Sequence, residues 1–448
     1  MYWDEASIGY NAYSVLKTGK DEWGETLPLH FRAFGEFKLP TYIYSVVIFE
    51  SIYGLTPYAV RLPAVIYGFL TVLGLYFLIF YISKNKKISL LSSFLFTITP
   101  WFFIFSRTGY EATAGLAFFI YALYFLLRSN EKRLNILISI VLFMLSAYSY
   151  NSFRILTPLI LGPFLLIYGI KAFKKKQKGD LISLFLSLLI LFVSIIPIYK
   201  LYSKDSGLSR LQTVGTNRNL VSNYFKNFSY NFLFVNGDTN PRNQIPGSSQ
   251  LYYLDAVFIL LGIIYILKKK DINNLYILAL LILAPIPAAI TRENPHALRA
   301  ILVSPVLVTI SAMGIYYLSE LVKKRKNLIL IVVLALYVLS FERYIYKFGN
   351  EYNNLSFDAW QYQYKELIEK NSDNFSKYEK VYITDKYAQP YIFFLFYQKV
   401  DPNLFINTKT LNDVSDWGFS TVKSFDKFNF IKDCGVNSNE KSLVICPK

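Results

Sequence analysis

The sequence predicts an all-α protein that crosses the membrane many times and ends in a small soluble α/β domain. Of its 448 residues, 54% are hydrophobic and only 17% are charged, a composition that soluble proteins do not use. The apolar residues come in blocks of about twenty, the length that spans roughly 30 Å of hydrocarbon. Lys and Arg collect in alternate connections between these blocks, which is typical of cytoplasmic loops.

Ten apolar blocks are expected to span the membrane as helices. They cover residues 57–82, 88–106, 112–128, 134–150, 154–170, 181–202, 251–267, 275–291, 300–322 and 328–346. With the basic connections in the cytoplasm, the segments expected outside are 1–56, 107–111, 151–153, 203–250, 292–299 and the tail. The chain thus divides into a first outer segment (1–56), a helical body (57–347) and a soluble extracytoplasmic domain (348–448). The net charge of +17 lies largely in the cytoplasmic connections, so no nucleic-acid partner is expected.

The first outer segment has no sequence that would carry it across the membrane. Met1-Tyr2-Trp3-Asp4 has neither a charged n-region nor an apolar h-region. We therefore expect a further transmembrane helix upstream of Met1, which would give the intact protein eleven spans.

The tail alternates polar residues with short apolar runs. This pattern predicts helices at 356–370 and 387–398 and strands at 380–384 and 442–446. The chain has only two cysteines, Cys434 and Cys446. On an oxidising side of the membrane they are expected either to form a disulfide or to stay free and buried in strands.

Two adjacent carboxylates, Asp4 and Glu5, lie near the start of the first outer segment. Aromatic neighbours at a membrane surface exclude water, and a carboxylate in such a place suits general-base work on a hydroxyl. The alternative is that both are solvated charges at the start of a helix, where they favour the dipole.

Charged residues also stand at the outer ends of two spans. Arg61 either snorkels to the interface or organises the outer segment by pairing with a carboxylate. Arg107 and Glu111 flank a turn between two spans, where ionisable groups are functional candidates, although an internal pair would also explain them.

Three further cations are candidates for binding phosphate. Arg154 lies among hydroxyl side chains at an outer helix mouth, and the segment 291–299 contains His296 and Arg299. A helix beginning after Pro295 would put these two on one face and add its dipole. The alternative for Arg299 is an interfacial anchor. His296 has only His30 as a companion, so no metal site is expected there.

Several common functions are disfavoured. The sequence has no phosphate-cradling Gly-Lys-Ser/Thr loop, dinucleotide fingerprint, nucleophile elbow or zinc-protease pair. A proton relay would require acidic residues at mid-membrane, whereas those of this chain lie mainly at helix ends and in loops. The chemistry is therefore expected at the outer membrane surface.

Several motifs resemble those of bacterial membrane glycosyltransferases of the GT-C fold. They are Trp-Asp-Glu-Ala, Phe-Gly-Glu-Phe-Lys-Leu-Pro, Arg-Leu-Pro, Ser-Arg-Thr-Gly-Tyr-Glu-Ala-Thr and Pro-His-Ala-Leu-Arg. Over about residues 1–347, the chain is similar to the protein mannosyltransferase and aminoarabinose transferase superfamily, which uses polyprenyl-phosphate sugars. The family's usual Lys-Pro-Pro is Lys38-Leu39-Pro40 here.

The resemblance implies transfer of a sugar from a polyprenyl phosphate to a protein, lipid or cell-envelope glycan outside the cytoplasm. Asp4 would be either the general base or a carboxylate that orients the acceptor, with Glu5 a secondary candidate. Glu111 would occupy the second outer loop's acidic position. The phosphate-binding cations would be Lys38, Arg154, His296 and Arg299. No redox cofactor is implied, and a divalent cation beside Asp4 and Glu5 is left open. The competing hypotheses are an oligosaccharide polymerase or ligase that uses lipid diphosphates, and a lipid or glycan flippase.

Overall fold

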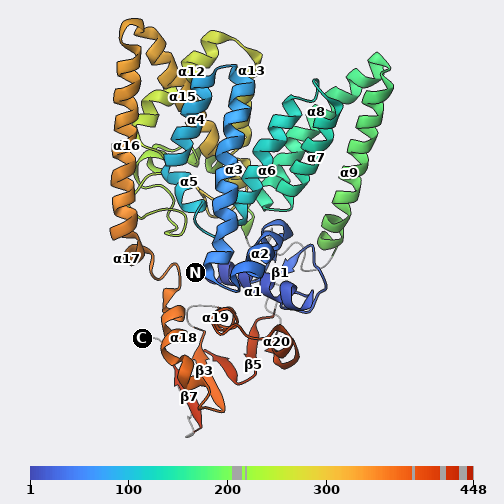
Figure 1. Cartoon of the computed structure of the whole chain (residues 1–448), viewed down its shortest axis with the longest axis vertical. Helices are drawn as coiled ribbons and strands as arrows, with labels where there is room; N and C mark the ends of the chain where they lie inside the picture. Colours follow the sequence, from blue (N-terminus) through green and yellow to red (C-terminus); the bar gives the residue numbers. More distant parts are fainter. Residues whose placement is uncertain (204–213, 217–218, 386–388, 414–419, 433–440, 447–448) are drawn as a thin grey trace. The chain divides into compact units, whose positions relative to one another are not determined.

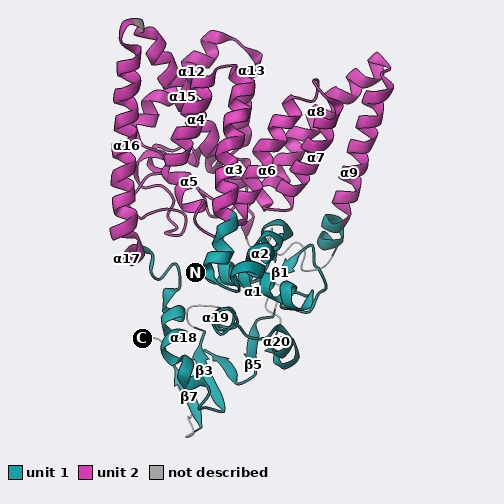
Figure 2. Cartoon of the chain, viewed as in Figure 1, with its two compact units in different colours: residues 1–63, 197–213, 356–448 teal, residues 64–196, 214–355 magenta. Residues whose placement is uncertain are grey.

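The structure is a computed structural model that describes residues 1–203, 214–216, 219–385, 389–413, 420–432 and 441–446. The chain forms two compact units, which Figure 2 shows in separate colours. Unit 1 consists of residues 1–63, 197–213 and 356–448, and unit 2 consists of residues 64–196 and 214–355. Segments from both ends of the chain therefore build unit 1.

Apolar helices make up most of unit 2 (Figure 1). Within the described residues, six helical segments are long and apolar enough to span a membrane: Pro57–Ser83 (α3), Asn151–Lys175 (α8), Lys178–Tyr202 (α9), Ile272–Ala289 (α13 and α14), Val303–Leu321 (α15) and Lys326–Asn350 (α16). Two shorter apolar helices are α6 (Glu111–Leu127) and α7 (Arg133–Ala147). The helical multi-pass class is confirmed.

The other expected blocks also coincide with helices. Residues 88–106 form α4 (Lys86–Ile98) and α5 (Pro100–Phe105), and residues 251–267 form α12 (Tyr253–Lys269). Shorter elements of this unit are α11 (Leu220–Lys226), the π-helical turn η2 (Asn231–Val235), the 3-10 turn η3 (Lys323–Arg325) and α17 (Tyr352–Ser356). Because α4, α5 and α12 are not among the six long spans, the count of ten spans stays a prediction.

Two glycines allow α12 and α15 to pack with their backbones in close contact. A Cβ on Gly262 would lie 1.9 Å from the carbonyl oxygen of Ile310, and one on Gly314 would lie 1.9 Å from that of Phe258. Without aqueous surroundings, close backbone approach at small residues is a main source of helix association. The same pair of helices carries Asp255, whose Oδ1 accepts a hydrogen bond from Ser311 at 2.7 Å.

Two helices lie within the segment that was expected to be a loop. Helix α1 (Trp3–Thr18) and helix α2 (Pro40–Tyr53) flank a short hairpin of β1 (Phe31–Arg32) and β2 (Phe37–Lys38). Gly19, with φ of 71°, ends α1 in the left-handed region, which glycine adopts without strain. This hairpin places Lys38 immediately before α2.

The tail contributes a five-stranded mixed sheet to unit 1. Its strands are β3 (Lys380–Thr384), β4 (Thr410–Leu411), β5 (Val422–Phe425), β6 (Phe428–Ile431) and β7 (Ser442–Ile445), in the order β4-β5-β6-β3-β7. Strand β3 is parallel to β6 and β7, and the other pairings are antiparallel. The helices are α18 (Tyr362–Phe375), α19 (Pro390–Tyr397) and α20 (Pro402–Thr408). The expected α/β tail is confirmed.

Aromatic side chains form the core of unit 1 and join α1 to the tail. The ring of Tyr10 lies 6.2 Å from that of Phe405, and its hydroxyl donates to the carbonyl of Val400 at 3.1 Å. A Cβ on Gly9 would come within 2.6 Å of the Phe396 ring. The predicted Cys434–Cys446 pairing stays a prediction, because Cys434 lies outside the described residues.

Candidate active site

The first candidate carboxylate, Asp4, forms an ion pair with a buried lysine in unit 1. The Nζ of Lys38 lies 2.5 Å from Oδ1 of Asp4 and 3.6 Å from Oε1 of Glu36. The Lys38 side chain is 3% exposed and that of Asp4 is 24% exposed. Asp4 is therefore the more accessible partner of this ion pair, and Lys38 is its counterion.

The neighbouring carboxylate, Glu5, is fully buried and forms a bidentate pair with Arg61. The guanidinium donates from Nε to Oε1 at 2.8 Å and from Nη2 to Oε2 at 2.7 Å. Arg61 also lies over the Trp360 ring, 5.5 Å from its centroid. This geometry favours a loop-organising role for Arg61 over snorkelling, because a parallel fork ties α1 to the start of α3.

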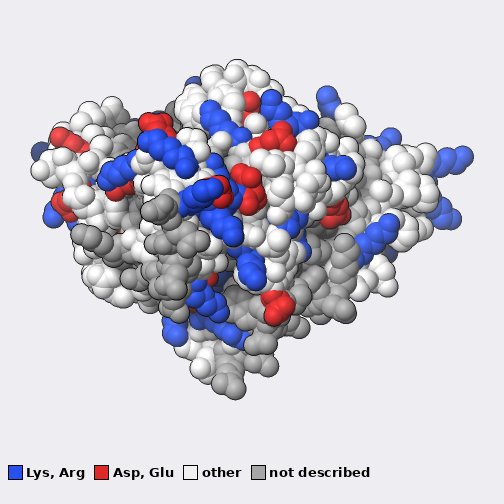
Figure 3. All heavy atoms as spheres, turned by 90° about the horizontal axis from the view of Figure 1, so that it is seen from below, with Lys and Arg blue, Asp and Glu red and all other residues white. Residues whose placement is uncertain are grey.

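Basic and acidic side chains are interspersed on the face seen in Figure 3. Since acidic groups lie among the basic ones on this face, individual side chains with defined partners are better evidence of a site than a broad charged patch.

A second buried acid, Glu22, lies in the connection between α1 and the hairpin. Its Oε1 accepts a hydrogen bond from the Asn11 amide at 3.2 Å, and its backbone carbonyl accepts one from Nζ of Lys409 at 3.0 Å. Burial raises the pKa of Glu22 to about 8. The Trp23 ring beside it contacts two cations, with Arg32 3.9 Å and Lys409 4.8 Å from its centroid. This cluster fastens the first segment to the tail.

In unit 2, the structure brings His296 and Arg299 together around Glu293. Glu293 Oε2 lies 3.8 Å from Nε2 of His296 and 3.1 Å from Nη2 of Arg299. Arg299 also donates to the hydroxyl of Thr291 at 3.0 Å. The Arg299 side chain is only 12% exposed, so its guanidinium is oriented by the surrounding protein.

The expected helix after Pro295 is wrong. Residues 297–302 form turns, and α15 begins only at Val303. His296 and Arg299 therefore meet through Glu293 rather than along a helical face, and no helix dipole acts on them directly.

The other predicted cations and the third acid lie at helix ends in unit 2. Arg154 is in the first turn of α8, where it donates to the carbonyl of Ala147 at 3.2 Å, and its neighbour Ser152 donates to the carbonyl of Arg299 at 3.0 Å. Arg107 donates to the carbonyl of Phe103 at 3.3 Å and lies over that ring. Glu111 is the first residue of α6.

The carboxylates of unit 1 do not suit a divalent ion. Asp4 and Glu5 each have a cationic partner within 2.7 Å, and a metal would compete with it. In the part of the chain that the structure describes, no three His, Cys, Asp or Glu side chains are grouped to hold a metal ion.

Sequence reasoning missed one carboxylate of the unit 2 site. Asp238 is 5% exposed and accepts hydrogen bonds from the backbone N–H of Ala297 at 2.7 Å and from the Asn243 amide at 2.9 Å. Asp238 and Ala297 are 59 positions apart, so spacing carried no signal. Its place in a run of turn-forming residues, Asn-Gly-Asp-Thr-Asn-Pro, was the only local indication.

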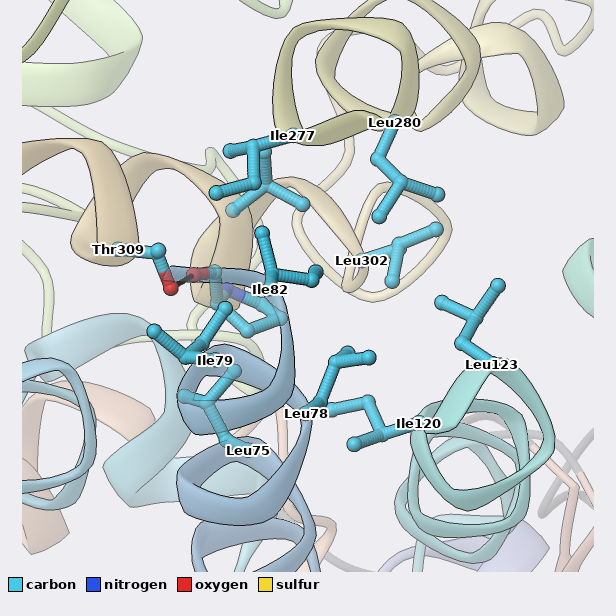
Figure 4. Close-up of a pocket in the computed structure, with 12 residues that line it drawn as sticks. Leu75, Leu78, Ile79, Ile82, Ile120, Leu123, Ile277, Leu280, Leu302 and Thr309 are labelled. Atoms are coloured by element: carbon cyan, nitrogen blue, oxygen red, sulfur yellow. Dashed lines mark hydrogen bonds between the residues drawn. The ribbon is translucent and has the colours of Figure 1, made fainter. Parts of the chain in front are cut away.

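A pocket in unit 2 is apolar rather than charged (Figure 4). Side chains from α3, α6, α13 and α15 line it, among them Leu78, Leu123 and Leu280. Its polar residue Thr309 donates its hydroxyl to the carbonyl of Pro305 at 2.7 Å. Such a lining suits hydrocarbon, and phosphate chemistry is therefore expected elsewhere.

The fold is that of a helical multi-pass membrane protein. Residues 38–198 match the family model of dolichyl-phosphate-mannose-protein mannosyltransferases. This match confirms the family resemblance predicted from the motifs. No curated protein matches the chain significantly.

Two proteins illustrate the solved structures to which the chain is similar. The apo oligosaccharyltransferase of Archaeoglobus fulgidus has a TM-score of 0.50 at 13% identity, covering 90% of this chain and 60% of its own. ArnT from Cupriavidus metallidurans in the apo state has a TM-score of 0.49 at 12% identity, covering 74% and 58%. The same protein bound to undecaprenyl phosphate has a TM-score of 0.43 at 12% identity, covering 74% and 59%. The chain thus spans about 60% of these proteins, and the likeness concerns the fold alone.

Proposed function

We propose that the protein is a membrane glycosyltransferase that moves a sugar from a polyprenyl-phosphate donor to a protein, lipid or cell-envelope glycan. The reaction takes place at the extracytoplasmic face, where the soluble domain also lies. The observation that carries the proposal is the accessible Asp4 carboxylate on its buried Lys38 counterion. The family match over residues 38–198 supports the class of donor.

Asp4 acts as the general base. A lysine at 2.5 Å favours the ionised carboxylate. This carboxylate removes the proton from the acceptor hydroxyl while the acceptor oxygen forms a bond to C1 of the sugar. The bond from C1 to the phosphate oxygen breaks, and its electron pair leaves with the polyprenyl phosphate. The configuration at C1 is inverted, since one displacement takes place.

Cations stabilise the charge that develops on the leaving phosphate. An ammonium has three donors, so Lys38 can bind a phosphate oxygen while it holds Asp4. Arg154, His296 and Arg299 are the further cations, and Arg299 provides a planar fork that matches phosphate. Removing one such preorganised contact typically costs about 3 to 4 kcal/mol of transition-state stabilisation.

Two acids have supporting roles. Glu5 is buried, and its two carboxylate oxygens accept hydrogen bonds from Nε and Nη2 of Arg61. Glu5 therefore helps to hold the start of α1, where Asp4 lies, in place. Glu111 begins α6 and is the acid of the second outer loop.

The test is transfer of labelled sugar from a panel of polyprenyl-phosphate donors into membrane and lysate acceptors. The protein would be assayed in isolated membranes. Asp4→Asn is expected to abolish transfer while the protein stays in the membrane. The control is Glu25→Gln, which removes an exposed carboxylate of the same unit and is expected to leave transfer unchanged.

Other outcomes would replace the proposal. Transfer of whole oligosaccharides only from lipid diphosphates would identify a polymerase or ligase. Movement of intact donor across the bilayer without cleavage would identify a flippase. Equal transfer by the wild type and Asp4→Asn would remove Asp4 as the base.

A further inference from the structure

The carboxylate of Asp238 is hydrogen-bonded to the turn that follows His296. Oδ2 of Asp238 accepts hydrogen bonds from the Ala297 N–H at 2.7 Å and the Asn243 amide at 2.9 Å, and Oδ1 accepts one from the Asn240 N–H at 2.9 Å. All three bonds are donated to the carboxylate, which is the arrangement an ionised acid requires. The side chain is 3% exposed, so its charge is poorly screened.

Burial alone would make this charge unfavourable. The pKa of Asp238 is raised, because desolvation outweighs the opposing effects of its three hydrogen bonds and the Arg299 cation. An asparagine or serine would be enough to hold the backbone of a turn. A buried acid is therefore more than the turn needs, and its surroundings indicate what the charge acts on.

The imidazole of His296 lies between two carboxylates. Its Nδ1 is 3.9 Å from Oδ2 of Asp238, and its Nε2 is 3.8 Å from Oε2 of Glu293. Arg299 is bound to the same Glu293 oxygen and partly neutralises it, and the Glu293 side chain is 75% exposed, so Asp238 is the buried one of the two carboxylates. Opposite charges at this distance favour the imidazolium form.

We propose that Asp238 is a positioning residue that keeps His296 cationic and fixed where the donor phosphate leaves. This role rests on the proposed function, in which a neutral imidazole would stabilise the leaving phosphate less than an imidazolium. Asp238 acts through His296 and through the Ala297 backbone.

Direct titration of His296 tests the proposal without an activity assay. The chain has two histidines, so the His30→Gln variant, labelled on histidine and held in lipid nanodiscs, gives the NMR titration of His296 alone. We expect a His296 pKa above the usual value of about 6.5. Asp238→Asn is expected to lower it by about one unit.

Asn243→Ala is the matched control, because it removes a hydrogen bond from the same carboxylate and leaves its charge. It is expected to change the pKa of His296 much less than Asp238→Asn does. An equal effect of the two variants, or none from Asp238→Asn, would overturn the proposal. If Asp238→Asn does not fold, the titration of the His30→Gln parent still tests the proposal. A His296 pKa below about 6.5 in that protein would contradict the proposal.

The transfer assay adds a second readout. Transfer is expected to be lost at high pH, as His296 loses its proton. Asp238→Asn is expected to lower the pH midpoint of this loss by about the same amount as it lowers the pKa of His296. No transfer by the parent, with the expected titration intact, would refute the proposed function and keep the Asp238–His296 coupling. Transfer by the parent, with a His296 pKa that Asp238→Asn leaves unchanged, would refute the Asp238–His296 coupling and keep the proposed function.

Discussion

Removing Arg61 should destabilise unit 1 strongly, because Glu5 would keep a buried charge without a partner. The Glu5 side chain is 0% exposed and both its oxygens are bound by the fork. Breaking a buried pair in this way typically costs about 3 to 5 kcal/mol. The Arg61 side chain is 35% exposed, so water relieves part of the cost and we expect about 3 kcal/mol for Arg61→Met.

The assay is denaturant unfolding in detergent micelles, followed by tryptophan fluorescence. Trp360 lies 5.5 Å from the Arg61 guanidinium, so it reports on the region of the pair. Adding Glu5→Gln to Arg61→Met removes the orphaned charge and is expected to recover about 2 kcal/mol.

An exposed ion pair provides the control. Arg133 and Asp180 also lie 2.7 Å apart, but Arg133 is 56% exposed, so Arg133→Met should cost no more than about 1 kcal/mol. The reasoning fails if Arg61→Met costs as little as this control, or if Glu5→Gln recovers nothing.

Three further predictions concern packing, pH and the counterion. Gly314→Val should separate α12 from α15 and reduce folded protein in membranes, since its Cβ would lie 1.9 Å from the Phe258 carbonyl; unchanged thermal stability would contradict this. The pKa of Glu22 is about 8 in the folded protein and 4.5 for an ordinary glutamate, so the folded state binds more protons between these values and stability should fall as pH rises through this range. Glu22→Gln should flatten that fall in a pH series of unfolding curves, and an identical slope would refute the assignment. Lys38→Met should lower transfer about a hundredfold, with partial activity in Lys38→Arg, and a wild-type rate would exclude Lys38 from the site.

The helical body was predictable because its signal is local. A block of about twenty apolar residues has few alternatives to a membrane helix, and all ten expected blocks coincide with helices or helix pairs in the described chain. Helices α1 and α2 were missed since they carry a weaker pattern. Their burial is completed by distant residues, as where Gly9 lies against Phe396.

The site was predictable as residue types but not as pairs. Asp4, Lys38, Glu5 and Arg61 were all candidates, yet local patterns assigned them separate roles, and the ion pairs Asp4–Lys38 and Glu5–Arg61 join residues 34 and 56 positions apart. Asp238 was missed for the same physical reason, because its partner is remote in the chain. Such pairings depend on tertiary packing, which local patterns do not encode.

The most direct test of the account is identification of the lipid product by mass spectrometry. Purified protein would be incubated with a polyprenyl-phosphate sugar and an acceptor extract. We predict accumulation of polyprenyl monophosphate in the wild type and in Glu25→Gln, and none in Asp4→Asn. Intact donor in every sample of correctly inserted protein, or equal release by Asp4→Asn, would contradict the assignment of Asp4 as the base of a sugar transfer.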